Sequence, residues 1–164
     1  MQFAIIFALT VLSTISPSLA RFVLPASLFV NSSNLAVSGS GIYGKHSGAG
    51  IDYLYLGDKS YNSSQLLMTD GTQLYTNRTG YAKYFNVDDH YAKLTVSGPN
   101  SKNIEFDYYD DKHYLTVGGE MGGFFACKNT SDPYNYSLSE FELMYYPTGG
   151  EGSACIPVNV YKAQ

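Results

Sequence analysis

Residues 66–75, LLMTDGTQLY, place two short apolar runs on either side of an Asp-Gly pair. Glycine in the second position of such a pair tolerates the positive φ of a tight hairpin turn. The stretch therefore predicts two antiparallel strands joined by a turn at Asp70 and Gly71. Residues 51–56, IDYLYL, alternate with the two-residue period of a strand and give one aromatic-rich face. Both patterns indicate antiparallel β-structure.

The same pattern extends through the chain, because short runs of Tyr, Phe, Val, Leu and Ile recur between clusters of Gly, Asn, Asp and Ser. The glycine-rich stretch 41–50 lacks the spacing of a phosphate-binding loop and is expected to be a mobile loop. No Pro/Ser-rich linker divides the chain, so we expect one domain with short, antiparallel connections. The predicted strands are 22–30, 34–38, 51–56, 65–69, 73–76, 81–87, 92–97, 103–108, 114–117, 124–127, 141–146 and 155–161.

A weak repeat runs through these strands. Leu54, Leu74, Leu94 and Leu115 follow one another at spacings of 20, 20 and 21 residues, and a unit of that length matches one β-hairpin. Six such hairpins would build a β-trefoil-like barrel, whose closure leaves no exposed edge strand. The predicted fold is all-β: a single compact antiparallel domain, β-trefoil-like or a closed barrel, with a two-sheet β-sandwich as the alternative.

Residues 1–20 have the pattern of a secretory signal peptide. The run FAIIFALTVL at 3–12 contains one polar residue, and Ser18 and Ala20 fit the small residues that precede a cleavage site. We expect cleavage before Arg21, which leaves 21–164 as one secreted all-β domain. The apolar run is too short to span a bilayer, so no membrane span is expected.

The charge distribution argues against two classes of partner. The net charge is -4, and the 10 basic residues are scattered singly. Such a chain offers no basic patch for nucleic acid or anionic lipid, so neither partner is expected.

Cysteines and sequons both fit the secretory route. Cys127 and Cys155 are the only cysteines, and in an oxidising compartment they are expected to form a disulfide. Five N-x-[ST] sequons exceed the roughly two that this composition would give by chance, and we expect N-glycosylation there. The sequons begin at Asn31, Asn62, Asn77, Asn129 and Asn135.

Signatures of enzymes, metals and cofactors are missing from the sequence. It contains no H-E-x-x-H, C-x-x-C, G-x-S-x-G or P-loop motif. His46, His90 and His113 have no metal-ligand partner at helical or hairpin spacing, and the acidic pairs at 88–89 and 110–111 do not resemble an EF-hand. We therefore expect no metal, no cofactor and no catalytic residue.

Two carboxylate pairs and a set of tyrosines leave other functions open. Glu105 with Asp107, and Glu140 with Glu142, each share a strand face, as glycoside hydrolysis would require of a pair. The chain also holds 16 Tyr and no Trp, and exposed tyrosine rings can stack on sugars. The residues proposed for carbohydrate contact are Tyr53, Tyr55, Tyr108, Tyr109, Tyr145 and Tyr146.

Residues 122–137, GGFFACKNTSDPYNYS, with LMYY at 143–146 and the late Cys155, resemble small secreted cell-wall proteins of Candida-type yeasts. The resemblance covers about the last third of the chain. It implies a fungal cell-surface or cell-wall mannoprotein without known catalysis. Some members carry glycosylphosphatidylinositol anchors, but this chain ends IPVNVYKAQ without a hydrophobic tail, so no lipid anchor is expected.

The leading hypothesis is a non-enzymatic, secreted cell-wall or cell-surface glycoprotein of a yeast-like fungus. The first alternative is a lectin-like module that binds cell-wall polysaccharide through tyrosines. The second is a secreted glycoside hydrolase that uses one of the carboxylate pairs.

Overall fold

The computed structural model describes residues 23–59, 65–69, 73–77, 80–88, 90–98, 103–149 and 154–163. The expected signal peptide, the turn at Asp70 and Gly71, and Asn62 lie outside these residues. Strands and one short 3-10 helix form the regular structure of the described part, in the order β1 (Val23–Asn31), β2 (Ile42–His46), β3 (Ile51–Leu56), β4 (Gln65–Thr69), β5 (Gln73–Thr76), β6 (Lys83–Val87), β7 (Ala92–Thr95), β8 (Ile104–Tyr109), β9 (Lys112–Val117), β10 (Glu120–Met121), β11 (Phe124–Cys127), η1 (Tyr136–Leu138), β12 (Phe141–Tyr145) and β13 (Cys155–Lys162).

Six of the strands form a ring in which five of the neighbouring pairs are joined by hydrogen-bonded ladders. β1 pairs with β4, β4 with β5, β8 with β9, β9 with β13, and β13 returns to β1, all antiparallel. β5 lies near β8, but the described residues of these two strands form no hydrogen-bonded ladder, so the curled sheet is a half-barrel. In the β4–β5 pair, Thr69 lies opposite Gln73, so the hairpin strands predicted from the Asp-Gly stretch are confirmed.

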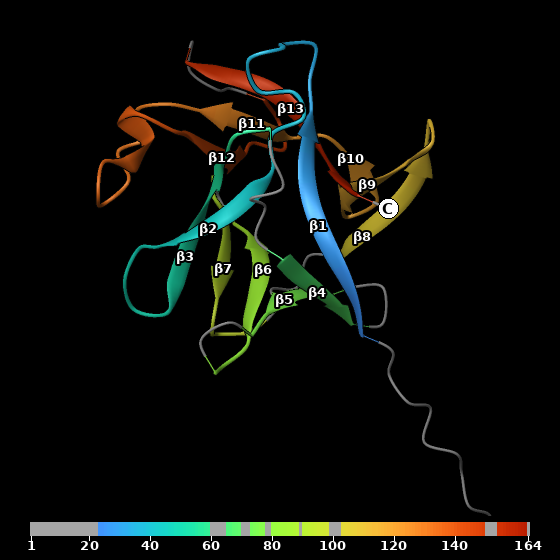
Figure 1. The fold of residues 1–164 in the computed structure, drawn as a ribbon, viewed down its shortest axis with the longest axis horizontal. Helices are drawn as coiled ribbons and strands as arrows, with labels where there is room; N and C mark the ends of the chain where they lie inside the picture. The colour runs from blue at the N-terminus through green and yellow to red at the C-terminus, as the bar shows by residue number, and fades with distance from the viewer. Residues whose placement is uncertain are drawn as a thin grey trace, which may run out of the picture.

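Three further hairpins, β2–β3, β6–β7 and β11–β12, cap this ring. They meet one another because β3 pairs with both β7 and β12, and an isolated bridge joins Tyr91 to Met144. Figure 1 shows β2, β3, β6 and β7 to one side of β1 and the β8–β9 hairpin to the other. A six-stranded barrel with a cap of three hairpins is the arrangement of a β-trefoil. The β-trefoil-like prediction is confirmed, and the sandwich alternative is wrong because the described strands join one sheet.

The leucine repeat has a structural counterpart. Leu54, Leu74, Leu94 and Leu115 lie in β3, β5, β7 and β9, each of which is the second strand of a hairpin. All four side chains are buried in the same hydrophobic cluster. The repeat therefore marks the positions where successive hairpins contribute to one core.

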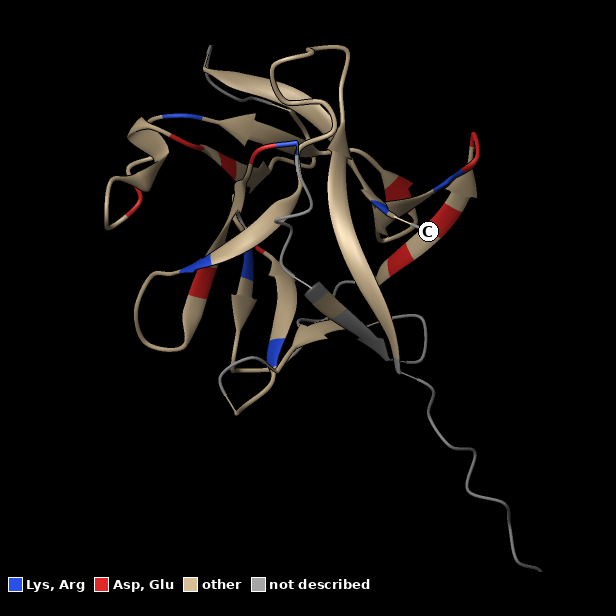
Figure 2. Cartoon of the chain, viewed as in Figure 1, with Lys and Arg blue, Asp and Glu red and all other residues tan. Residues whose placement is uncertain are grey.

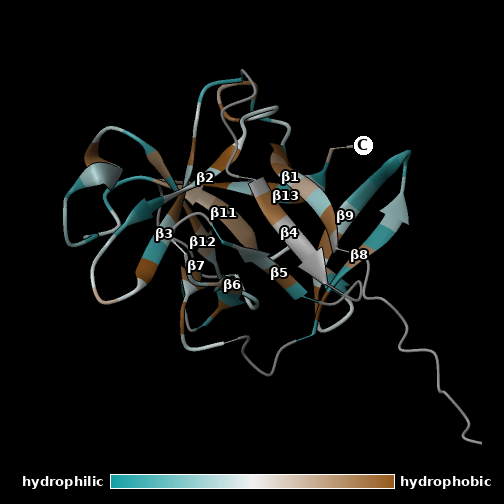
Figure 3. Ribbon diagram, turned by 60° about the horizontal axis from the view of Figure 1, so that its bottom comes forward, coloured by the Kyte–Doolittle hydropathy of each residue, from teal (hydrophilic) through white to brown (hydrophobic). Residues whose placement is uncertain are grey.

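The β8–β9 hairpin projects from the body of the domain. Figure 2 shows acidic residues along β8 and at the hairpin tip, while basic residues are spread over several elements. Figure 3 shows the outer part of the same hairpin as largely hydrophilic. At the tip, Asp110 and Asp111 have positive φ of 47° and 60°, a conformation that Asp tolerates in tight turns.

Two predictions about local structure are wrong. The strand expected at 34–38 is a turn, because Asn34 Oδ1 accepts a hydrogen bond from the Ala36 amide at 2.9 Å and the Asn34 carbonyl accepts from Val37 and Ser38. The expected loop at 41–50 contains β2, whose residue Gly44 lies opposite Leu54. The short strand β10 was not predicted.

Gly44 explains why a glycine-rich stretch forms a strand here. A Cβ added at Gly44 would lie 3.3 Å from both Asp52 Cβ and Leu94 Cδ1. Glycine inside a strand commonly marks such a close approach. The glycine therefore allows the β2–β3 hairpin to pack closely on β7.

The predicted disulfide between Cys127 and Cys155 is present. The two residues lie opposite each other in the β11–β13 pair. The bond therefore ties a capping hairpin to the last strand of the barrel.

Candidate functional site

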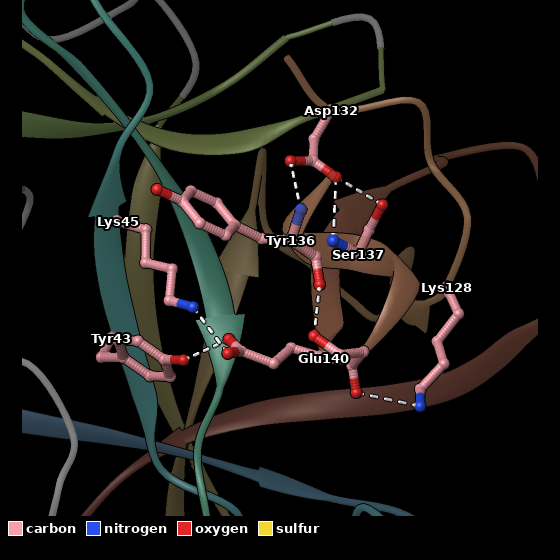
Figure 4. Close-up of polar contacts among 8 residues, drawn as sticks. Tyr43, Lys45, Lys128, Asp132, Tyr136, Ser137 and Glu140 are labelled. Atoms are coloured by element: carbon pink, nitrogen blue, oxygen red, sulfur yellow. Dashed lines mark hydrogen bonds and ion pairs between the residues drawn. The ribbon is translucent and has the colours of Figure 1, made fainter. Parts of the chain in front are cut away.

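The segment between β11 and β12, residues 128–140, packs against the β2–β3 hairpin and contains two buried polar residues, Asp132 and Ser137. It follows directly after Cys127, contains η1, and carries the sequons of Asn129 and Asn135. Figure 4 shows its side chains together with those contributed by β2.

Lys45 is the centre of the contact between β2 and this segment. Its Nζ lies 2.6 Å from Glu140 Oε1 and 4.3 Å from the centroid of the Tyr136 ring. The rings of Tyr55 and Tyr43 lie slightly farther from Nζ, at 5.6 and 5.8 Å. The ammonium thus contacts a carboxylate and three aromatic rings, which both attract a cation.

Glu140 is fully engaged by these neighbours. The Tyr43 hydroxyl donates to its Oε2, and Lys45 donates to its Oε1. Burial alone would raise the pKa of Glu140, but the hydrogen bonds from Lys45 and Tyr43 hold the pKa below its ordinary value. Burial and the same carboxylate raise the pKa of Tyr43.

Asp132 holds the turn that leads into η1. Its carboxylate accepts hydrogen bonds from the Tyr136 amide at 2.9 Å, the Ser137 amide at 2.8 Å and the Ser137 hydroxyl at 2.5 Å. Burial opposes the charge, but these bonds lower the pKa of Asp132 below its usual value. A buried carboxylate that accepts several N–H and O–H bonds is well stabilised in its ionised form.

Glu142 is the opposite case, a fully buried carboxyl with only part of its hydrogen bonding satisfied. The Thr130 hydroxyl donates to Oε2, whereas Oε1 has no hydrogen-bond partner among the described residues. Burial raises the pKa of Glu142, the hydrogen bond from Thr130 lowers it and the nearby Asp132 carboxylate raises it, so that the resulting pKa is about 7. Burial, then Glu142 and Asp132, also raise the pKa of Tyr55.

The predicted carboxylate pairs lie in different parts of the molecule. Glu105 and Asp107 lie on β8, where Asn103 Nδ2 donates to Glu105 at 3.3 Å and Asp107 is exposed. Glu140 precedes β12 rather than lying within it. Three surface hollows of about 390, 280 and 250 Å³ are lined by other residues, and none of the four acids lines any of them.

The six tyrosines proposed for carbohydrate contact do not form one surface. Tyr55 and Tyr145 are buried, so the structure contradicts sugar contact for these two. Tyr53 stacks on the ring of Tyr91, with centroids 5.0 Å apart, and Tyr146 packs against Phe125 and His90. Tyr108 and Tyr109 are 61% and 64% exposed near the tip of the β8–β9 hairpin. For them, sugar contact stays a prediction.

The predicted sequons differ in their surroundings. The Asn31 amide donates to the Tyr114 hydroxyl at 3.0 Å, whereas Asn77, Asn129 and Asn135 are exposed. N-glycosylation stays a prediction at each of the five sequons.

The three histidines lie apart, in different contacts. His46 Nδ1 lies 3.3 Å from the same Asp52 oxygen that Lys83 Nζ contacts at 2.6 Å. His113 packs against Tyr108. Within the described ranges, no group of three or more His, Cys, Asp or Glu side chains is placed to hold a metal ion.

Comparison with known proteins finds three curated relatives, all from Candida albicans. Cell wall protein RHD3 is 32% identical over 146 residues, which is 82% of this chain and 64% of the relative. Cell wall proteins PGA30 and PGA31 are 28% and 29% identical over 90% and 91% of this chain, and over 51% and 49% of their own lengths. This chain is similar to Candida cell wall proteins. The resemblance inferred from residues 122–137 is confirmed, and the relatives support a secreted, cell wall location.

The chain spans about half to two thirds of the length of these cell wall proteins. No family model matches it, and no solved structure matches it. Among the described residues, no helix is both long and apolar enough to cross a membrane.

Sequence reasoning missed most of the polar cluster. Lys45 lay in the expected loop, and Asp132 and Thr130 were noticed only as part of the resembling stretch. The contact of Lys45 with Glu140 joins residues 95 positions apart, and no local pattern signals such a contact.

Proposed function

We propose that this cell wall protein relative acts as a non-catalytic, secreted domain of the wall. The observation that carries the proposal is that three acids around η1, the half-buried Glu140 and the buried Asp132 and Glu142, are used for structural contacts. Glu140 is bound by Lys45 and Tyr43, and Asp132 by the backbone and hydroxyl of η1. Glu142 is enclosed in the core of the cap. Catalytic carboxylates must instead reach a substrate in a cleft.

The location can be tested by fractionating producing cells. A tagged chain should be recovered from the wall or the medium, and the same chain lacking residues 1–20 should stay inside the cell. Recovery of the full chain only from the cytosol would contradict the proposal.

A second proposal concerns polysaccharide contact and rests on the exposure of Tyr108 and Tyr109. Adjacent residues on a strand point to opposite faces, so each ring would contact a sugar separately rather than forming one platform. Acidic residues surround them, and the Tyr108 hydroxyl donates to Asp111 at 3.0 Å. Ring stacking with hydroxyl hydrogen bonds suits neutral sugars.

Sedimentation with insoluble glucan and chitin tests this contact. Saturable binding should be lost in the double variant Tyr108→Ala with Tyr109→Ala. It should persist in Tyr81→Ala, which removes another exposed tyrosine, located just before β6. Absence of saturable binding by the parent chain would contradict the contact.

A further inference from the structure

In the sequon Asn135-Tyr136-Ser137, the first side chain is exposed to solvent and the last is buried. The Asn135 side chain is exposed and makes no capping hydrogen bond to η1. Ser137, two residues later, is only 1% exposed. The group that would carry a glycan is therefore accessible, whereas the hydroxyl that completes the sequon is not.

The Ser137 hydroxyl is held by two partners. It donates to Asp132 Oδ1 at 2.5 Å and accepts a hydrogen bond from the Thr130 amide at 3.1 Å. The Ser137 backbone is held as well, because its amide donates to Asp132 and its carbonyl accepts from Asn129 at 3.0 Å. Every polar group of Ser137 is thus engaged inside the 128–140 segment.

The backbone of the sequon is also far from extended. Asn135 has a left-handed φ of 57°, and Tyr136–Leu138 form η1. The N-x-[ST] motif requires the amide and the hydroxyl to be presented together. In the folded segment, the Ser137 hydroxyl is buried and donates to Asp132.

We infer that Asn135 is glycosylated only before the 128–140 segment folds, and that the finished fold closes the acceptor site while leaving an attached glycan in solvent. The reaction joins Asn135 Nδ2 to C1 of the first sugar and breaks the C1–O bond to a polyprenyl pyrophosphate carrier, which leaves with the bonding electrons while the amide proton passes to a base of the transferase or to water. The inference depends on the proposed secretory route, because that route supplies the donor and the transferase. The fraction of chains that carry a glycan at Asn135 would then report how fast the 128–140 segment folds relative to the rate of glycosylation.

The test uses the full chain made without glycans and carrying the Cys127–Cys155 disulfide. Native chain, and chain that has been reduced and unfolded, are incubated with purified oligosaccharyltransferase and lipid-linked oligosaccharide. Mass spectrometry measures occupancy at Asn135, and a short acceptor peptide in both reactions controls for enzyme activity. We expect near-complete loss of Asn135 modification in the native chain relative to the unfolded chain. Equal modification of both forms would overturn the inference.

Two variants separate the contacts of Ser137 from general folding. Asp132→Asn keeps the sequon but weakens the acceptor of the Ser137 hydroxyl, so native Asn135 should become modified more than in the parent. Ser131→Gly removes the Asn129 sequon at a position whose positive φ of 61° glycine adopts without strain, and Asn135 should stay unmodified in its native form. If Asp132→Asn does not fold, the comparison of native and unfolded parent chain still shows whether folding blocks modification of Asn135. Failure of Asn135 to be modified even in the unfolded chain would overturn the inference, yet leave the proposed wall location untouched, because that is tested by fractionation.

Discussion

Lys45 Nζ lies 2.6 Å from Glu140 Oε1, which joins β2 to a residue 95 positions farther along the chain. Both side chains are only partly exposed, at 25% and 32%. The contact fixes the 128–140 segment on the cap of the trefoil. The same contact engages Glu140, which the sequence alone left as a candidate catalytic acid.

Replacing Lys45 with Met should destabilise the fold. The change removes the ion pair and the contact with the Tyr136 ring while keeping an unbranched apolar side chain. We expect a loss of about 1–2 kcal/mol in the free energy of unfolding, measured by urea titration. In a double-mutant cycle with Glu140→Gln, the two effects should not add. Strict additivity would show that the pair is uncoupled.

Glu142 should make the protein less stable as the pH rises. The pKa of Glu142 is about 7 in the fold against a reference of 4.5, so the folded chain holds this proton more tightly than the unfolded chain. The stabilisation is complete below pH 4.5 and is lost as the pH rises to 7, amounting to about 3 kcal/mol. Glu140 and Asp132, whose pKa values are lowered, act in the opposite direction and only at more acidic pH.

The urea concentration at the midpoint of unfolding, determined at pH 5 and at pH 7.5, measures the loss of stability that accompanies ionisation of Glu142. The parent chain should have the higher midpoint at pH 5. Glu142→Gln, which cannot ionise, should lose most of the difference. A parent chain that is equally stable at pH 5 and pH 7.5 would show that ionisation of Glu142 does not destabilise the fold.

Gly44→Ala should destabilise the β2–β3 hairpin. The new methyl would lie 3.3 Å from atoms of Asp52 and Leu94, and such crowding in a packed region costs about 1–3 kcal/mol. Gly57→Ala is the matched control, because its methyl would meet the Tyr43 ring at an ordinary 3.5 Å. Thermal unfolding should show a clearly larger loss for Gly44→Ala, and equal losses would refute the steric argument.

Removing the disulfide should lower stability without changing the fold. Cys127 and Cys155 close a sequence separation of 28 residues, for which chain entropy gives about 3–4 kcal/mol. Comparison of the parent with the double variant Cys127→Ala with Cys155→Ala in urea measures the loss. An unchanged midpoint would contradict a stabilising role.

Much of the fold could be predicted because its signals are local. The Asp-Gly stretch predicted the β4–β5 pairing, and the leucine spacing identified the hairpin unit of the trefoil. β2 was missed because glycine is common in loops, whereas Gly44 is needed for the close approach of Leu94. The turn at Asn34 was missed because a side chain competes with the strand for backbone hydrogen bonds.

The polar cluster of the 128–140 segment could be predicted much less well. The two acids around residue 140 were noted as a pair on one strand face, but Glu140 and Glu142 have different partners and opposite pKa shifts. Those differences come from Lys45, Tyr43 and Thr130, which reach the acids only through tertiary contacts. Exposure likewise separates Tyr108 from Tyr55, although both lie in aromatic-rich strands.

The most direct test of the account is mass spectrometry of the protein recovered from the wall and medium of producing cells. We predict a chain that begins at Arg21, with Cys127 linked to Cys155 and sugar on at least one sequon. An intact chain that keeps Met1, has two free thiols and carries no sugar would contradict a secreted cell wall domain.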